Sequence, residues 1–400
     1  MNTCESRVPR YRLPDPLRRA DGRTVDTPDD WWRWRRPELT DLFAGHVYGR
    51  TPAELPPVEY EVLDEDTAAL GGTAIRRQVR CRFGDRVHLD LLLYLPTGVR
   101  PAPVLCGLNF FGNHTVHPDP AIVPPTGWVP DLGGATGHRA RVESRGMQSG
   151  RWPVEALLRR GYGVATGYAG DLYPDDPHAD LTAAVPTLYG GARPRGASDW
   201  GALGAWAWGL SRMLDHLADD PALDARRVAV VGHSRLGKAA LWASAQDERF
   251  AMAVSNNSGC GGAALARRRF GETVAAITGQ FPHWFCPAYA GYADREDALP
   301  VDQHLLLALV APRPLYVASA EQDLWADPRG EFLSARHASD VYRLLGADGL
   351  PAAEMPPVDV PVAGRIGYHV RSGGHDITAA DWDRFCDFAD RHLPPASPAD

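Results

Sequence analysis

The stretch Val228-Ala-Val-Val-Gly-His-Ser-Arg-Leu-Gly-Lys238 decides the fold that we expect for this chain. Its valine-rich first half is typical of a buried strand, and the residues after Gly237 are compatible with a helix. Ser234 lies at the junction, with one glycine two residues before it and another three residues after it. A Cβ atom would clash where a strand and a helix approach closely, so glycine suits both positions. The stretch therefore predicts a sharp turn that exposes the Ser234 hydroxyl.

The spacing of the two glycines departs by one residue from the common nucleophile elbow. In that motif, Gly-x-Ser-x-Gly, the second glycine comes two residues after the serine. Here Gly237 comes three residues after Ser234. A strand-to-helix turn without catalytic function is therefore the alternative interpretation of this stretch.

Apolar runs of strand length alternate with helix-compatible segments over most of the chain downstream of residue 103. Such alternation is typical of a mostly parallel sheet with helices on both faces. The sequence therefore predicts an α/β protein, a three-layer sandwich that forms a single domain over residues 1–400. Period-2 alternation over residues 58–96 adds antiparallel strands to this prediction, and residues 338–345 are expected to be helical.

Three segments depart from the alternating pattern. Residues 1–56 are predicted to form an N-terminal arm and an aromatic helix, at residues 31–43, whose tryptophans serve as packing anchors. Residues 115–150 and 170–195 are rich in Pro with Gly or Asp, and they exceed the usual length of a connection. We expect these two long loops to lie near the active site.

Composition excludes several classes of function. The net charge of −8 argues against a surface that binds nucleic acid. The six cysteines form no C-x-x-C pair, and the sequence suggests neither a metal nor a cofactor. No uninterrupted apolar run is long enough to span a membrane, and the N-terminus lacks a signal-peptide core. We therefore expect a cytoplasmic protein. We also expect it to be a monomer whose partner is a small molecule or an oligosaccharide.

Three polar residues follow predicted strands at the sheet edge where ligands bind in such folds. Their order along the chain, Ser234, Asp323, His375, is that of the α/β-hydrolases. A serine needs a base to become a nucleophile, histidine provides one near neutral pH, and an acid holds its tautomer. The acid is less certain than the other two, because three more carboxylates lie close in sequence: Glu321, Asp327 and Asp376.

An esterase must also stabilise an oxyanion, and this is often the largest single contribution to catalysis. The backbone N–H of Arg235 and the loop at residues 109–112 are candidate donors. The Arg235 guanidinium is a third candidate, because a charged donor forms strong hydrogen bonds in a partly dry site. The alternative for this guanidinium is an ion pair on the helix.

Several motifs in combination resemble one known family over nearly the whole chain. They are Gly232-His-Ser-Arg-Leu-Gly-Lys238, Asn256-Asn-Ser-Gly-Cys-Gly-Gly-Ala-Ala264, Leu299-Pro-Val-Asp-Gln-His304, Ala311-Pro-Arg-Pro314 and Gly374-His-Asp376. They resemble the bacterial glucuronoyl esterases, carbohydrate esterase family fifteen. Members are metal-free α/β-hydrolases that cleave the ester between 4-O-methyl-glucuronic acid on xylan and an alcohol of lignin.

The resemblance implies a role for individual residues of this chain. Ser234 would be the nucleophile, His375 the base and Arg235 an oxyanion donor. Three residues would contact the uronate: Lys238, Gln280 and Trp325. Four others lie in matching stretches, with no role assigned: Glu272, Trp284, Asp302 and His304. The implied activity is that of a serine carboxylesterase acting on a small-molecule or oligosaccharide uronate ester.

Two departures from the fungal members affect this hypothesis. His233 stands where the fungal enzymes have a cysteine, and Asn257 stands near the position of their acidic glutamate. The second departure favours Asp323 as the acid. Two alternative functions stay open, namely an acetyl esterase of the same fold and a non-catalytic carbohydrate-binding pseudo-hydrolase.

Overall fold

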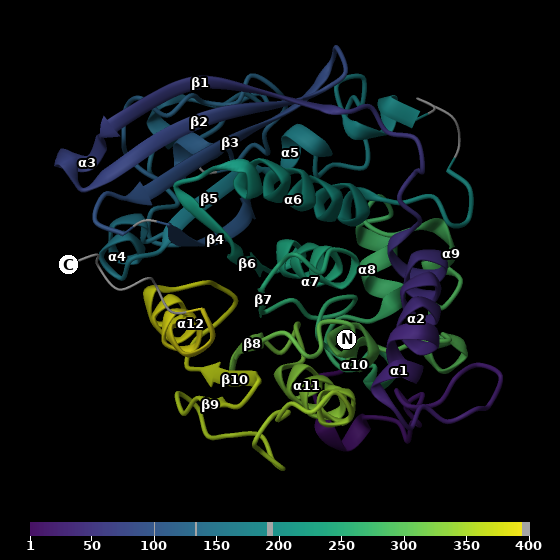
Figure 1. Cartoon of the computed structure of the whole chain (residues 1–400). Helices are drawn as coiled ribbons and strands as arrows, with labels where there is room; N and C mark the ends of the chain where they lie inside the picture. Colours follow the sequence, from purple (N-terminus) through teal and green to yellow (C-terminus); the bar gives the residue numbers. More distant parts are fainter. Residues whose placement is uncertain (100, 133, 190–194, 394–400) are drawn as a thin grey trace.

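The structure is a computed structural model that describes residues 1–99, 101–132, 134–189 and 195–393. The described strands form one ten-stranded sheet in the order β1-β2-β3-β5-β4-β6-β7-β8-β10-β9 (Figure 1). The strands are β1 (Val58–Ala68), β2 (Ala74–Phe83), β3 (Val87–Pro96), β4 (Ala102–Asn109), β5 (Gly163–Tyr168), β6 (Leu223–His233), β7 (Met252–Asn256), β8 (Leu315–Ala320), β9 (Val362–Ala363) and β10 (Ile366–Arg371).

The middle of the sheet is parallel and its edges are antiparallel. Strands β5, β4, β6, β7, β8 and β10 pair in parallel. At one edge β1, β2 and β3 form an antiparallel meander that joins β5, and at the other edge β9 pairs antiparallel with β10. The predicted α/β-hydrolase fold and the antiparallel strands over residues 58–96 are therefore confirmed.

Helices cover both faces of this sheet, and each face has its own hydrophobic core (Figure 1). The larger core lies under α6 (Ala202–Asp219), α7 (Arg235–Gln246), α10 (Gln303–Ala308) and α11 (Pro328–Leu344). The smaller core lies under α4 (Val154–Arg159) and α12 (Ala379–His392). Helices α3 (Ala69–Gly72), α5 (Ala169–Leu172), α8 (Val274–Gln280) and α9 (Pro287–Ala290) lie in the segments between these elements.

Register brings the carboxyl ends of four parallel strands to one edge of the sheet. His233 at the end of β6 pairs with Asn256 at the end of β7, and Asn256 pairs with Ala318 of β8. Arg371 at the end of β10 pairs with Ala320 at the end of β8. Loops that leave strands at a common edge must converge, so the residues that follow these strands are neighbours in space.

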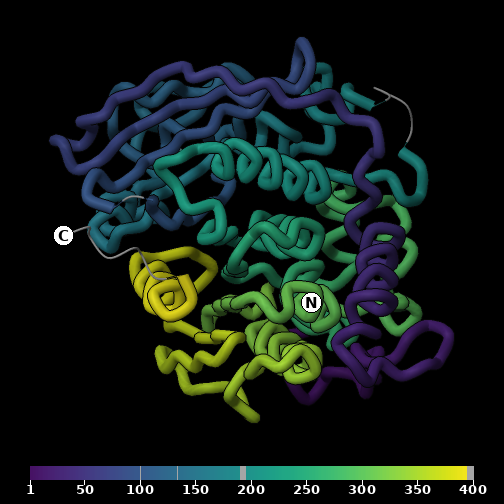
Figure 2. The backbone as a smooth tube through the Cα atoms, viewed as in Figure 1, coloured from purple at the N-terminus to yellow at the C-terminus, as the bar shows by residue number. Residues whose placement is uncertain are grey.

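The N-terminal segment contains a continuous helical run. It consists of α1 (Pro28–Asp30), a π-helical turn (Trp31–Arg35), α2 (Arg36–Phe43) and a second π-helical turn (Ala44–Tyr48). Figure 2 shows this run in purple beside the green segment that contains α9, and the backbone N–H of Cys286 donates to Val47. The prediction that its tryptophans are packing anchors is right only for Trp31, which is fully buried. Two others are exposed, Trp32 by 39% and Trp34 by 45%.

Helix α11 begins earlier than the sequence predicted. The helix was expected at residues 338–345, but it begins at Pro328. The carboxylate of Asp327 accepts a hydrogen bond from the N–H of Gly330 and so caps the first turn. Proline is favourable in the first turn of a helix, because its missing N–H has no partner there. The cap and the proline therefore start the helix ten residues before the predicted start at residue 338.

The two predicted long loops are present as mostly irregular chain. The first follows a short 3-10 turn at Asn113–Thr115 and contains another at Val142–Ser144. The second begins within α5 and contains a 3-10 turn at Val185–Tyr189. Residues 133 and 190–194 of these predicted loops lie outside the described residues.

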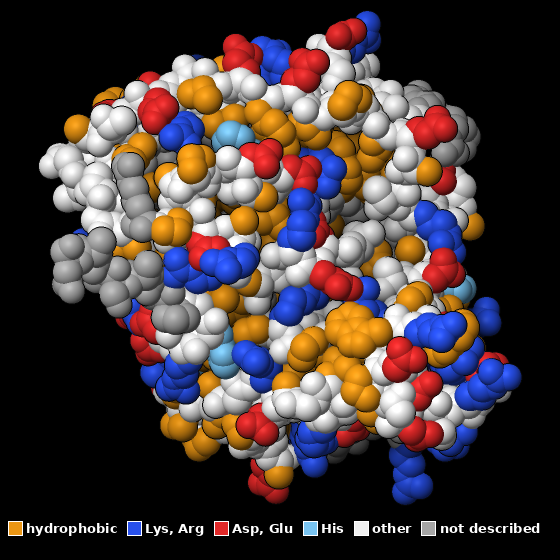
Figure 3. All heavy atoms as spheres, in the orientation of Figure 1, with side chains coloured by type: hydrophobic (Ala, Val, Ile, Leu, Met, Phe, Trp, Pro, Cys, Tyr) orange, Lys and Arg blue, Asp and Glu red, His pale blue; other side chains and the backbone are white. Residues whose placement is uncertain are grey.

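Charged side chains of both signs are interspersed on the face that Figure 3 shows, with hydrophobic side chains between them. In the described part of the chain, no helix is both long and apolar enough to cross a membrane.

Candidate active site

Ser234 lies on a strained turn between β6 and α7. Its backbone has φ 57° and ψ −131°, a conformation that a side-chain-bearing residue rarely adopts. A Cβ on Gly232 would lie 2.1 Å from the carbonyl oxygen of Leu236, and one on Gly237 would lie 3.0 Å from that of Gly232. The two glycines are therefore the residues that let strand and helix approach, despite the altered spacing.

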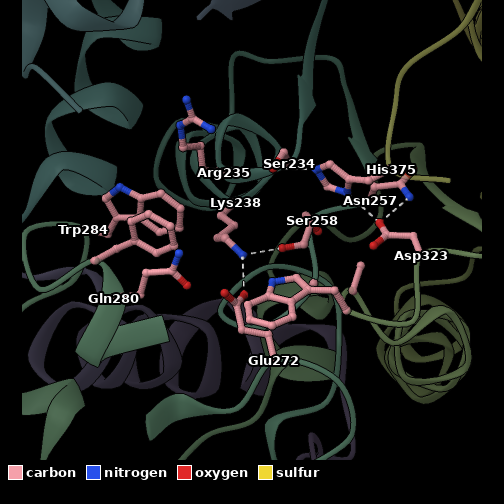
Figure 4. Close-up of a pocket in the computed structure, with 14 residues that line it drawn as sticks. Ser234, Arg235, Lys238, Asn257, Ser258, Glu272, Gln280, Trp284, Asp323 and His375 are labelled. Carbon is pink, nitrogen blue, oxygen red and sulfur yellow. Dashed lines mark hydrogen bonds and ion pairs between the residues drawn. The ribbon is translucent and has the colours of Figure 1, made fainter. Parts of the chain in front are cut away.

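The structure brings together the three residues predicted to act as a triad. Nε2 of His375 lies 3.0 Å from Oγ of Ser234, and Nδ1 lies 2.6 Å from Oδ2 of Asp323 (Figure 4). An ionised carboxylate only accepts, so Nδ1–H donates to Asp323 and Nε2 is free to accept from the serine. This is the tautomer that a general base needs.

The environment of Asp323 favours its charged form. Burial works to raise the pKa of Asp323, but the hydrogen bond and charge of His375 and the amide of Asn257 outweigh it and hold the pKa below its usual value. Nδ2 of Asn257 donates to Oδ2 of Asp323 over 2.8 Å. The asparagine found near the position of the fungal acid therefore supports the carboxylate that follows β8.

The other candidate acids contact different partners. Asp327 is buried, forms an ion pair with Arg268 at 2.8 Å and caps α11. Asp376, although next to His375 in sequence, forms an ion pair with Arg151 at 2.6 Å. No hydrogen bond joins Glu321 to His375 in the described part of the chain. Asp323 is therefore the carboxylate that orients the imidazole.

His233, the residue before the nucleophile, packs against His375. The ring centroids lie 4.7 Å apart. Nδ1 of His233 accepts a hydrogen bond from Nδ2 of Asn256, which also donates to the carbonyl of Asp376. Burial, helped by the nearby charge of His375, lowers the pKa of His233 well below its usual value. His233 is therefore neutral, and its ring packs against one side of the His375 imidazole.

A pocket of about 340 Å³ opens beside Ser234 and His375. It is lined by Arg235 and Lys238 from α7 and Gln280 from α8 (Figure 4). Trp325, from the turn after β8, also lines it. The Nζ atom of Lys238 lies 2.6 Å from the carbonyl oxygens of both Ser258 and Cys260. These two bonds fix the ammonium group and leave its third N–H for other partners.

Comparisons with known proteins agree with this geometry. Residues 186–346 match the family model described as glucuronyl esterase, fungi. A carbohydrate esterase from an unknown prokaryotic organism is 47% identical, with 98% of this chain and 92% of that protein aligned. The glucuronoyl esterase from Solibacter usitatus is 44% identical, covers 97% of this chain and 100% of its own, and superposes with a TM-score of 0.92. The chain belongs to the glucuronoyl esterase family.

Family membership makes this protein a carboxylic ester hydrolase. A more distant relative, the 4-O-methyl-glucuronoyl methylesterase of Schizophyllum commune, is 30% identical over 84% of this chain and 74% of its own length. Among the described residues of this glucuronoyl esterase, no group of three or more His, Cys, Asp or Glu side chains is arranged to hold a metal ion.

The predicted oxyanion donors of this glucuronoyl esterase have mixed outcomes. The Arg235 guanidinium lines the pocket, but its Nε atom also forms the predicted alternative, an ion pair, with Oδ2 of Asp175 at 2.5 Å. In the loop at residues 109–112, the N–H of Gly112 already donates to the side chain of Asn109. The loop therefore contributes fewer free donors than the sequence suggested.

Four residues that lie in family-like stretches divide into two pairs. Glu272 and Trp284 line the pocket, and Glu272 lies 3.8 Å from Nζ of Lys238. Asp302 instead caps α10, and His304 donates to the carbonyl of Pro14. The first pair belongs to the site, and the second pair stabilises the fold.

Sequence reasoning did not single out Asp175, which contacts two of the residues that line the pocket. Asp175, in the predicted loop at residues 170–195, forms the ion pair with Arg235 and accepts hydrogen bonds from His283 and Trp284. The only signal in the sequence was the length and Asp content of that loop, which does not single out one aspartate.

Proposed function

We propose that this enzyme hydrolyses esters of glucuronic or 4-O-methyl-glucuronic acid through an acyl-enzyme on Ser234. The observation that carries the proposal is the hydrogen-bonded chain Ser234–His375–Asp323, whose three residues line one pocket. A relative is named a 4-O-methyl-glucuronoyl methylesterase, and a fungal neighbour was solved with methyl 4-O-methyl-β-D-glucopyranuronate. Both support a uronate ester as the substrate.

In the first half of the reaction, Oγ of Ser234 attacks the ester carbonyl carbon, C6 of the uronate. The hydroxyl proton moves to Nε2 of His375, 3.0 Å away, while Asp323 stabilises the imidazolium that forms. The tetrahedral intermediate then collapses. The bond from C6 to the alcohol oxygen breaks, and the alcohol leaves with the proton from Nε2.

In the second half, water attacks the ester that joins Ser234 to the uronate. His375 takes a proton from this water and returns it to Oγ of Ser234 as the acyl bond breaks. The products are the free uronate and the regenerated serine. The net reaction consumes one ester and one water, and it yields one acid and one alcohol.

The oxyanion of each tetrahedral intermediate needs donors close to Ser234. The backbone N–H of Arg235 comes directly after the nucleophile, at the start of α7, where helix N–H groups have no intrahelical partner. The Arg235 guanidinium lines the same pocket. We assign both as oxyanion donors, because hydrogen bonds to a developing charge strengthen in a partly dry site.

The remaining pocket residues suit a sugar acid. The third N–H of Lys238 and the amide of Gln280 are donors for ring hydroxyls, and Glu272 is an acceptor. Trp325 is 40% exposed at the pocket, where its ring can cover the apolar face of a pyranose. We assign Lys238, Gln280 and Trp325 to uronate binding.

An ester panel with the wild type and the Ser234→Ala variant tests this proposal. The substrates are methyl and benzyl glucuronate, acetylated xylose and p-nitrophenyl acetate. We expect glucuronate hydrolysis, and we expect Ser234→Ala to lower kcat by roughly 10⁴-fold or more. Ser149→Ala, at an exposed position, is the matched control and should behave like the wild type.

Other outcomes of the panel would change the assignment. Hydrolysis of acetyl esters alone would keep the triad but make the enzyme a sugar deacetylase. A wild type that cleaves none of these esters, and whose Ser234 is not labelled by a fluorophosphonate, would contradict the proposal. Such a result would favour the carbohydrate-binding interpretation.

A further inference from the structure

Each basic group that lines the pocket has its own carboxylate. Nε of Arg235 lies 2.5 Å from Asp175, Nζ of Lys238 lies 3.8 Å from Glu272, and Nδ1 of His375 lies 2.6 Å from Asp323. Figure 4 shows the last two pairs on different sides of the pocket. The cationic side chains of Arg235 and Lys238 are thus each offset by a carboxylate, and the neutral imidazole of His375 is paired with the ionised Asp323, although the proposed reaction turns a neutral ester into an anion.

The Arg235 guanidinium is the cation nearest the nucleophile in sequence, and it is largely removed from water. Its side chain is 25% exposed, and its central carbon lies 4.5 Å from the ring centroid of Phe110 and 5.9 Å from that of Trp284. Among the described residues, Asp175 is the one carboxylate within 4.0 Å of this guanidinium. Without Asp175, a poorly hydrated cation would face the pocket.

Asp175 is held firmly by groups other than Arg235. Its Oδ1 atom accepts from Nε2 of His283 over 2.9 Å and from Nε1 of Trp284 over 2.6 Å. Burial works to raise the pKa of Asp175, but these hydrogen bonds and the charge of Arg235 keep the pKa below its usual value. Asp175 is therefore ionised, and it presents Oδ2 to Arg235 in one fixed geometry.

The pairing of Arg235 with Asp175 affects how tightly the pocket binds the uronate product relative to the neutral ester substrate. A guanidinium binds a carboxylate through two parallel hydrogen bonds, and such charge-assisted pairs are strong. A free Arg235 would therefore bind the uronate product more tightly than the neutral ester, and the product would occupy the site. Asp175 already occupies Nε and offsets the positive charge.

We propose that Asp175 is a positioning residue that neutralises Arg235, so that the pocket binds the neutral ester in preference to its uronate product. This inference rests on the proposed function, because it needs a uronate ester as the substrate. Arg235 keeps two terminal nitrogens for the oxyanion, whose charge exists only during the reaction. The pair thus limits product inhibition without removing the donor.

The test measures binding rather than turnover. The Ser234→Ala protein cannot form the acyl-enzyme, so its Kd values for methyl glucuronate and for glucuronate can be measured by calorimetry at pH 7. Adding Asp175→Asn should lower the Kd for glucuronate by about tenfold and change the Kd for the methyl ester by less than about threefold. A merely structural role for Asp175 would change both values together.

Two further variants test whether the loss of any nearby charge gives the same result, and whether Asp175 acts through Arg235. Asp176→Asn removes the same charge one residue further on, where the carboxylate accepts from the backbone of His178, and should leave the ratio of the two Kd values unchanged. With Arg235→Gln also present, Asp175→Asn should no longer change this ratio, because the cation that Asp175 offsets is absent.

Each remaining outcome has a definite meaning. An unchanged ratio in folded Asp175→Asn would overturn the inference. If that variant does not fold, the Arg235→Gln variant provides the test. The inference requires that Arg235→Gln raise the Kd for glucuronate at least about tenfold more than the Kd for the methyl ester. Equal changes in the two Kd values would overturn the inference. If the Ser234→Ala parent binds neither ligand, the proposed function fails instead.

Discussion

The loops that follow β7 and β8 lie side by side, yet only one of them presents a carboxylate to His375. The first loop carries Asn257 and the second carries Asp323, and the amide of Asn257 donates to Oδ2 of Asp323. The same oxygen accepts from Nδ1 of His375. The acid is thus defined by its distance from the imidazole, and a neutral donor in the neighbouring loop holds it in place.

A second contrast lies within the loop after β8. Asp323 and Asp327 are four residues apart and both buried, but Asp323 faces the pocket whereas Asp327 pairs with Arg268 and caps α11. One aspartate therefore contacts the imidazole of His375, and the other stabilises the start of α11. This difference can be tested by substituting each carboxylate in turn.

The largest effect is expected for Asp323→Asn. An amide N–H that faces Nδ1 of His375 forces the imidazole into the wrong tautomer, so Nε2 can no longer accept the Ser234 proton. We expect kcat to fall by about 10⁴-fold with little change in KM. Steady-state kinetics on methyl glucuronate measure this, and a variant that keeps more than a tenth of the wild-type kcat would remove Asp323 from the mechanism.

Asp327→Asn should have the opposite profile. It leaves Arg268 buried with a weaker partner, and breaking a buried ion pair costs about 3–5 kcal/mol of stability. Denaturant unfolding should show this loss, while kcat per folded molecule should stay within about threefold of the wild type. If kcat fell by several orders of magnitude in fully folded protein, Asp327 rather than Asp323 would be the acid of the triad.

Glu331 of α11 extends the contrast to a third carboxylate, buried beneath the loop after β7. Its Oε1 accepts from the backbone N–H groups of Ser258 and Gly259, and its Oε2 accepts from Ser319. Burial raises the pKa of Glu331 to about 8, from 4.5 for an unperturbed glutamate. Between these values the folded state holds a proton that the unfolded state releases.

The contribution of Glu331 to stability is therefore complete below pH 4.5 and is lost as the pH rises through about 8. Glu331→Gln should abolish this dependence, which has a slope of up to about 1.4 kcal/mol per pH unit. The measurement is urea unfolding of both proteins at pH 6 and pH 8, with Glu54→Gln at an exposed site as the control. Parallel stability curves for the wild type and Glu331→Gln would refute the expectation.

The smallest effect is expected for Asn257→Ala. This change removes one donor from Asp323 but leaves its hydrogen bond with His375 intact. A hydrogen bond to a charged group contributes about 1.5 kcal/mol or more, so kcat should fall by roughly tenfold. The kinetics should show no change in KM for methyl glucuronate. A kcat equal to that of the wild type would mean that the hydrogen bond from Asn257 to Asp323 does not contribute to catalysis.

Local signals in the sequence predicted a large part of the fold and the site. The elbow at Ser234 was predictable because Gly232 and Gly237 satisfy a steric requirement within a few residues. The parallel sheet was predictable because its strands read as apolar runs. The start of α11 was missed, because the Asp327 cap, eleven residues before the predicted start of the helix, was not recognised. The cytoplasmic location and the monomeric state stay predictions.

Local signals in the sequence could not predict which carboxylate contacts His375. Spacing placed Asp323 and Asp327 on one loop after β8, but it could not tell which of them faces His375. That outcome depends on Arg268, which forms a buried ion pair with Asp327. Asp175 carried no motif at all, because its role comes from contacts with Arg235, His283 and Trp284 across three segments of the chain.

By itself the sequence indicated the class of fold, and it pointed to Ser234 as the nucleophile and His375 as the base. Strand periodicity, the glycines around Ser234 and the place of His375 after the last predicted strand are signals that can be seen without the tertiary structure. Tertiary structure decided which aspartate completes the triad, that Asn257 supports it, and that Asp175 pairs with Arg235. The physical reason is distance: hydrogen bonds and ion pairs act over about 3 Å, and only the folded chain determines which distant residues come that close.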